Sequence, residues 1–167
     1  DNEWGRPVRD EQKMFEFLLL ETFQAGLSWI TVLKKREAFR AVFHQFEIAR
    51  VASMTEKEIQ EALQNARIIR HEAKIRAAIT NAQCVLELHA RGTTLVDFFW
   101  SYVDGTPIQN AWNELSEIPA KTDVAIQLSK DLKALGFKFI GPTVVYAHMQ
   151  ATGMVNDHLT NCPYYEA

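Results

Sequence analysis

A glutamate on an apolar helix face is the first candidate for chemistry in this sequence. On a helical wheel, Glu21 falls between Met14 and Phe17, away from the polar residues that precede it. A carboxylate in such a place is costly unless it is paired or lies in a cleft, and burial raises its pKa. Glu21 is therefore either a ligand-binding, catalytic carboxylate or a structural one, held by a neighbouring helix start or by Arg36. The residues alone leave both readings open.

Two tryptophans could offer flat surfaces to a ring-shaped ligand, because indole faces stack on planar rings and attract cations. Trp29 follows a candidate helix cap, Ser28, and stands two helical turns after Glu21, whereas Trp4 belongs to the opening segment. Core filling is the alternative, since that is the usual place of an aromatic residue in a helical domain. The position of Trp29 near a helix start favours ligand contact. For Trp4, both ligand contact and core filling stay open.

A histidine and a cysteine near the end of the chain have the spacing of metal ligands. His158 and Cys162 are separated by three residues, which suits two positions of a tetrahedral zinc. Asp157 could orient the His158 ring. Two ligands are only half of a site, and an unrelated histidine and cysteine are the commoner explanation of such a pair.

A short connection between two helical patterns could bind a phosphate. Gly136 stands where a left-handed helix end is expected, and Pro142 suits the first position of the next helix. The first N–H groups of a helix have no partner within it, so they can donate to a phosphate oxygen. We expect these donors at Gly141 and Thr143, with Lys138 nearby. A plain tight turn is the alternative.

The elements that position these residues are all expected to be helices. Residues 105–121 lack a helical pattern and are predicted to form a long loop, and no stretch alternates for long enough to predict a strand. The sequence therefore predicts an all-α fold with one domain over residues 1–167. The predicted helices start at or near Asp10, Ser28, Ile48, Thr55, His71, Thr94, Thr122 and Pro142.

Composition sets broad limits on function. The 167 residues are 47% hydrophobic and 23% charged, which is typical of a globular protein, and no apolar run is long enough to span a membrane. Two cysteines do not make a disulfide framework, so a reducing cytoplasm is expected. The net charge of −3 means that any nucleic-acid footprint must be local. Residues 34–40 and 67–76 are basic enough to supply one, although a solvated helix face is the commoner explanation of each run taken separately.

Several motifs together resemble one family, the bacterial DNA-3-methyladenine glycosylase of the constitutive type. The resemblance covers essentially the whole chain and implies a helix–hairpin–helix DNA glycosylase, a monomer that binds double-stranded DNA containing alkylated adenine. It would flip out 3-methyladenine and hydrolyse the N-glycosidic bond, leaving an abasic site. The motifs are residues 1–5 (DNEWG), 24–36 (QAGLSWITVLKKR), 69–71 (IRH), 136–139 (GFKF) and 154–158 (MVNDH), followed by Cys162.

The resemblance also implies roles for the candidates. It places Glu21 in the alkyl-base pocket, where Trp29 and Trp4 could stack on the expelled base. It makes His158 and Cys162 ligands of a structural zinc whose other two ligands lie in an N-terminal segment that this chain lacks, so the chain is expected to be trimmed.

Two departures from the wider helix–hairpin–helix pattern stand out. Phe139 replaces the first glycine of the hairpin, and Asp157 lies too close to the hairpin for the catalytic aspartate of many relatives. A base methylated at N3 is already cationic and leaves as a neutral molecule, so a strong acid is not required. The remaining alternatives are a non-catalytic helix–hairpin–helix DNA-binding module and a zinc-stapled interaction protein without DNA affinity.

Overall fold

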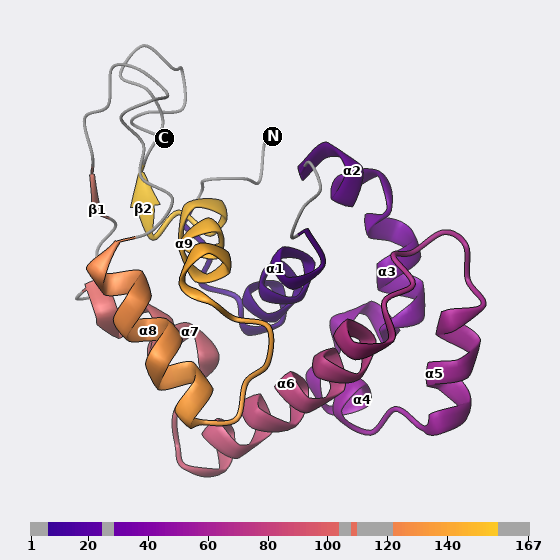
Figure 1. Cartoon of the computed structure of the whole chain (residues 1–167). Coiled ribbons are helices and arrows are strands. Elements are labelled where there is room, and N and C mark those ends of the chain that lie inside the picture. Colours follow the sequence, from indigo (N-terminus) through magenta and orange to yellow (C-terminus); the bar gives the residue numbers. More distant parts are fainter. Residues whose placement is uncertain (1–6, 25–28, 104–107, 110–121, 157–167) are drawn as a thin grey trace.

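The computed structural model describes residues 7–24, 29–103, 108–109 and 122–156, and its elements are almost all helical. No helix in these ranges is long and apolar enough to cross a lipid bilayer. Figure 1 shows the elements in chain order: α1 (Glu11–Gln24), α2 (Trp29–Lys34), α3 (Arg36–Val42), η1 (His44–Phe46), α4 (Ile48–Ala52), α5 (Glu56–Leu63), α6 (Glu72–Ala90), α7 (Leu95–Trp100), η2 (Ser101–Val103), β1 (Ile108–Gln109), α8 (Asp123–Ala134), α9 (Pro142–Ala151) and β2 (Val155–Asn156).

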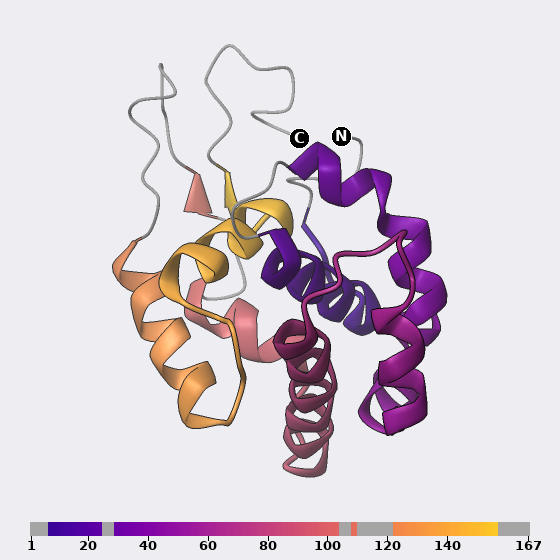
Figure 2. The same ribbon diagram turned by 45° about the vertical axis from the view of Figure 1, so that its right-hand side comes forward.

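Helix α1 is the central element of the domain. It runs between α9 on one side and the α2–α3 segment on the other, and it also packs against α6 and α7 (Figures 1 and 2). Every residue from Met14 to Phe23 is buried, including Met14, Phe15 and Leu18 at 0% exposure. A helix buried on all sides is a core helix, so any polar side chain on it needs a partner or a purpose.

Predicted helix starts are confirmed by their capping bonds. The Lys13 N–H donates to Asp10 Oδ1 at 2.8 Å, and the hydroxyls of Thr55, Thr94 and Thr122 each accept from the N–H three residues on, at 3.0 to 3.3 Å. His71 caps α6 through its ring, whose Nδ1 lies 3.3 Å from the Lys74 nitrogen. These bonds fix where the helices begin, and so the all-α prediction is correct.

The predicted hairpin between α8 and α9 is also confirmed. Gly136 has φ +101°, its N–H donates to the Lys133 carbonyl at 3.0 Å, and the Phe137 N–H donates to the Leu132 carbonyl at 3.1 Å. This pair of bonds closes α8, and Pro142 then opens α9. Leu128 and Leu132 of α8 are both fully buried, so this helix packs firmly beneath the hairpin.

Two features were not predicted. The pattern from Ser28 to Phe43 predicted one helix, but the structure divides it at Lys35 into α2 and α3. Residues 108–109, in the predicted loop, pair in parallel with residues 155–156. Two residues are too few to show alternation, and a parallel pairing between distant segments leaves no local signal. This pairing joins the segment after α7 to the segment after α9.

Candidate active site

Glu21 lies in the last part of α1 and is only 2% exposed. Its Oε2 atom accepts no hydrogen bond from the residues that the structure describes. Burial raises the pKa of this carboxyl from 4.5 to about 8, because the charged form loses its hydration. Glu21 is therefore mostly neutral at pH 7, which is unusual for a glutamate and typical of a functional carboxyl.

The alternative partner suggested for Glu21 is occupied elsewhere. Arg36 donates through Nε to Glu16 Oε2 at 2.9 Å, and Arg40 donates to the same oxygen at 2.8 Å. Glu16, expected on the polar side of α1, is 6% exposed because α3 packs there and brings both arginines to it. The ion pair that the structure shows for Arg36 is therefore with Glu16 and not with Glu21.

The two tryptophans can be placed only in part. Trp29 is the first residue of α2, which packs directly against α1, but its side chain lies outside the described residues. Trp4 lies outside them entirely. The described backbone thus brings residue 29 back beside the helix that carries Glu21. Whether the two indoles face that carboxyl stays a prediction.

The hairpin is held from two sides by side chains of other helices. The fully buried Asn81 of α6 donates to the Lys138 carbonyl at 3.1 Å and accepts from the Lys138 N–H at 2.8 Å. Ser129 of α8 donates to the Ile140 carbonyl at 2.6 Å. Gly141 is the N-cap of α9 without a side-chain cap, and Thr143 is exposed. The three predicted phosphate contacts therefore share one rigid hairpin.

Sequence reasoning missed Asn81, although a signal was present. Asn81 interrupts the apolar side of α6, between Ala78 and Ala82, where a buried amide must find hydrogen-bond partners. Its partners lie 57 residues further along the chain, and only the fold reveals them. The amide pairs with both the N–H and the carbonyl of one hairpin residue, Lys138, and so it holds the two peptide groups that flank this residue.

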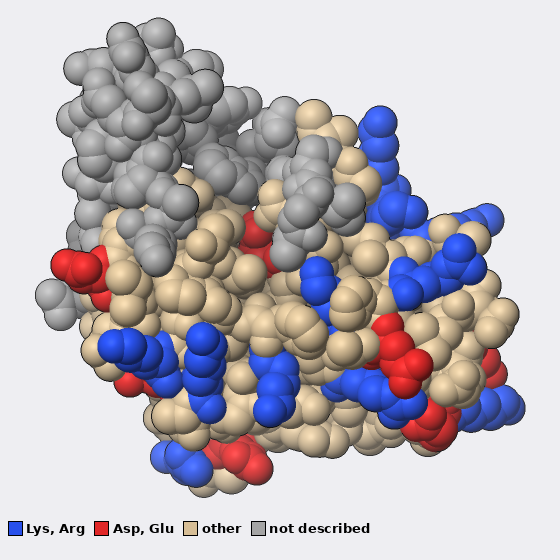
Figure 3. Space-filling view, viewed as in Figure 1, with Lys and Arg blue, Asp and Glu red and all other residues tan. Residues whose placement is uncertain are grey.

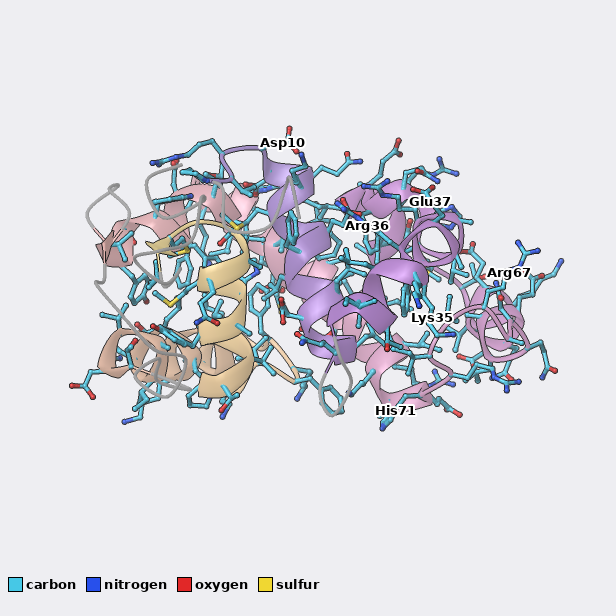
Figure 4. All side chains as sticks on the ribbon, turned by 90° about the horizontal axis from the view of Figure 1, so that it is seen from above. Asp10, Lys35, Arg36, Glu37, Arg67 and His71 are labelled. Atoms are coloured by element: carbon cyan, nitrogen blue, oxygen red, sulfur yellow. The ribbon has the colours of Figure 1, made fainter. Side chains whose placement is uncertain are left out.

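Basic side chains are spread across the face of the molecule that carries the hairpin (Figure 3). His71, at the start of α6, lies at the edge that faces the viewer in Figure 1, as the view from above shows (Figure 4). Lys138 and Arg70 are exposed, whereas Arg76 is engaged in ion pairs with Glu56 and Glu72. Local positive charge therefore coexists with the negative net charge.

The basic run at residues 34–40 does not form one surface. Arg36 and Arg40 pair with Glu16, while Lys34 and Lys35 line a cavity of about 590 Å³ together with Arg67. The Lys35 ammonium donates to the Arg67 carbonyl at 3.4 Å, which links α2–α3 to the segment after α5. In Figure 4, Lys35 and Arg67 lie on the side of the domain away from α9.

The predicted zinc ligands, His158 and Cys162, lie outside the described residues. Within the described part of the chain, no group of three or more histidine, cysteine, aspartate or glutamate side chains could hold a metal. The zinc site stays a prediction.

A helical domain with a hairpin held by side chains of α6 and α8, and with a buried carboxyl on its central helix, is the architecture of a helix–hairpin–helix DNA glycosylase, a hydrolase of N-glycosyl bonds. The family model described as methyladenine glycosylase matches residues 1–165. The curated DNA-3-methyladenine glycosylase 1 of Escherichia coli (strain K12) is 52% identical over 99% of this chain and 88% of its own length. The Haemophilus influenzae (strain ATCC 51907 / DSM 11121 / KW20 / Rd) DNA-3-methyladenine glycosylase is 50% identical over 98% of this chain and 88% of its own.

Solved structures agree with these sequence matches. The Staphylococcus aureus 3-methyladenine DNA glycosylase I, solved to show how it recognises 3-methyladenine, superimposes with a TM-score of 0.95 and 40% identity. The alignment covers 100% of this chain and 89% of that one. This chain therefore belongs to the methyladenine glycosylase family, which confirms the resemblance described from the motifs.

Proposed function

We propose that this protein removes 3-methyladenine from double-stranded DNA by flipping the nucleotide out and hydrolysing its N-glycosidic bond, leaving an abasic site. The observation that carries the proposal is Glu21, a carboxyl that is 2% exposed and has no described counter-charge. The solved relative that recognises 3-methyladenine supports the choice of base. A reducing cytoplasm and a monomeric protein belong to the same proposal.

The proposed role of Glu21 follows from its unusual pKa. Burial keeps the empty site neutral at pH 7, since the pKa is raised to about 8. A cationic methylated base beside the carboxyl lowers that pKa again, so Glu21 releases its proton and the two charges neutralise each other. The carboxylate then accepts from the exocyclic amine of the methylated adenine. Guanine would present O6 to it, which is repulsive and excludes 7-methylguanine.

Catalysis on this substrate requires little acid or base strength. The cationic base already departs as a neutral molecule, so the pocket must bind it, reject normal adenine and position a water. We assign the stacking on the flipped base to Trp29 and Trp4, which replace the stacking lost on leaving the duplex. Glu21 acts in this scheme by favouring the cationic base over the neutral one.

The test is release of free base from methylated duplex DNA. Glu21→Gln keeps the shape but places an amide donor against the donors of the base, and this should cost roughly 1.5–3 kcal/mol of base affinity. Glu37→Gln is the control, because the Glu37 side chain is 84% exposed. If the parent protein releases no 3-methyladenine, the proposed function is wrong and a DNA-binding module replaces it. If Glu21→Gln releases the base as the parent does, the proposed role of Glu21 is wrong while the proposed function stands.

The hairpin is proposed to hold a DNA phosphate through Lys138 and the backbone N–H groups of Gly141 and Thr143. Lys138→Ala should weaken binding to damaged and undamaged duplexes alike and reduce the salt slope by about one unit. Lys133→Ala is the matched control, since Lys133 is an exposed lysine near the end of α8. An effect confined to damaged DNA would argue against a phosphate contact.

A structural zinc at His158 and Cys162 is part of the proposal. Thiolate and imidazole ligands suit zinc at roughly 2.0–2.3 Å, and such a site would fasten the two ends of the domain. Elemental analysis should find zinc in a protein that also carries the two N-terminal ligands the resemblance implies, and should find less after Cys162→Ser. If that protein contains no zinc under reducing conditions, the predicted zinc site is wrong.

A further inference from the structure

Phe139, at the tip of the hairpin, combines exposure with an unfavourable backbone conformation. Its side chain is 44% exposed, which makes it one of the few large apolar residues that the described surface leaves open. Its φ is +57°, in the left-handed region that glycine adopts without cost. Neither property helps the fold, because the ring gains little burial and the backbone stays strained.

The surrounding hairpin prevents Phe139 from relaxing. The backbone of the preceding residue, Lys138, is fixed by its two hydrogen bonds with Asn81, and the following carbonyl, of Ile140, is fixed by Ser129. Phe137 and Ile140 are buried at 2% and 0% exposure, and they anchor the hairpin on both sides. Phe139 is therefore the residue that these anchors turn outward.

The exposed ring has one aromatic neighbour. The His71 ring meets it edge to face, with ring centroids 6.1 Å apart and planes at 78°. His71 is itself fixed, because its Nδ1 caps the first turn of α6. Each ring is preceded in the chain by an exposed basic residue, Lys138 before Phe139 and Arg70 before His71. The two rings therefore come from backbone that also carries positive charge.

We propose that the Phe139 ring, backed by His71, packs against a deoxyribose of the DNA strand whose phosphate the hairpin binds. This inference rests on the proposed DNA binding and adds a contact to it. A sugar face is apolar and lies directly beside the phosphate, so a ring next to Lys138 is suitably placed to cover it. Such a contact adds affinity without displacing counterions, and it is independent of base identity.

The experiment measures duplex affinity as a function of salt for Phe139→Gly and Phe139→Asn. Both residues tolerate positive φ, so the hairpin keeps its conformation and the melting temperature should stay equal or rise. Affinity for undamaged and damaged duplexes should fall equally, by roughly fivefold to tenfold, as for an aromatic ring that loses an apolar contact. The salt slope should not change, in contrast to Lys138→Ala.

Two further variants complete the test. Phe139→Tyr keeps the ring and should bind DNA like the parent, and so should Leu86→Ala, which removes another exposed apolar side chain about 22 Å along α6 from His71. If the glycine and asparagine variants bind both duplexes as tightly as the parent, the inference is wrong while the proposed function stands. A loss restricted to damaged DNA, or a changed salt slope, would equally overturn the sugar contact. A parent protein without DNA affinity would overturn the proposed function instead.

Discussion

Helix α1 carries two buried glutamates that are treated in opposite ways. Glu16 is 6% exposed and accepts from Arg36 and Arg40, whereas Glu21 is 2% exposed and has no counter-charge among the described residues. The pKa of Glu21 is raised to about 8 by its burial. Glu16, a carboxylate that joins two helices, and Glu21, which burial keeps neutral, are thus only five positions apart on one helix.

The difference shows that burial alone does not define the role of a carboxyl. A paired buried carboxylate becomes costly to remove, because its partners would remain charged in a dry place. An unpaired buried carboxyl destabilises the folded state at neutral pH, because it must take up a proton when the chain folds. Proteins retain the second kind where a ligand supplies the missing partner, at the expense of stability. The two glutamates should therefore respond to substitution with opposite signs.

The largest expected effect is on Glu16. Glu16→Ala leaves Arg36 and Arg40 without their shared partner, and the free energy of unfolding should fall by about 3 kcal/mol. Glu37→Ala is the control, since its exposed ion pair with Arg40 should contribute less than about 1 kcal/mol. Urea unfolding followed by circular dichroism gives both values. Equal losses for the two variants would mean that the Glu16 cluster is not a structural link.

Glu21→Gln should have the opposite sign at neutral pH. The parent must take up a proton to fold, since the unfolded pKa is 4.5 and the folded one about 8, while glutamine needs none. The variant should be more stable by up to about 3 kcal/mol at pH 7, while its affinity for 3-methyladenine falls. The same urea titration, paired with base binding, measures both. A destabilised variant would place Glu21 among the structural carboxylates, with Glu16.

The smallest expected effect is on the pH dependence of the free energy of unfolding, to which buried His148 contributes as well as Glu21. This histidine of α9 is fully buried against Met14 and Phe99, and burial lowers its pKa from 6.5 to about 3. As pH falls through that window, the unfolded chain binds a proton that folded His148 cannot, so stability is lost. As pH rises from 4.5 to about 8, folded Glu21 holds a proton that the unfolded chain has released, so stability is also lost.

Between pH 4.5 and 6.5 the pH dependences of the two groups therefore cancel, so the free energy of unfolding stays level. It declines below and above this range. Each decline has a limiting slope of roughly 1.4 kcal/mol per pH unit. Unfolding free energies of parent and Glu21→Gln at about pH 6.5 and about pH 7.5 test the alkaline side. The parent should lose stability between these values, whereas the variant, which keeps only the His148 contribution, should not. Parallel profiles would contradict the raised pKa of Glu21.

The fold was largely predictable because its signals are local. Asp10, Thr55, Thr94 and Thr122 cap helices where the sequence predicted them, and Gly136 ends α8 as expected. The break at Lys35 and the pairing of residues 108–109 with 155–156 depend on tertiary contacts, which leave no periodic pattern. Local rules therefore predicted the elements better than the connections between them.

The candidate site was predictable only where a polar side chain interrupts an apolar helix face. Glu21 could be noticed because it is charged on an apolar face, and its burial is confirmed. Glu16 gave no such signal, since its partners lie 20 and 24 residues away and reach it only through packing of α3. His148 was missed for the same reason. Asn81 did interrupt the apolar side of α6, but its partner Lys138 lies 57 residues away in the sequence. The roles of Trp29 and Trp4 stay predictions.

The clamp that Asn81 places on Lys138 has a consequence for hydrogen exchange. An amide at the exposed tip of a hairpin normally exchanges rapidly with solvent, but the Lys138 N–H donates to a side chain that is 0% exposed. Its exchange therefore requires that α6 and the hairpin separate. The Lys138 amide should exchange as slowly as amides of the core helices, so that a single resonance reports whether the proposed DNA-binding hairpin is docked on α6.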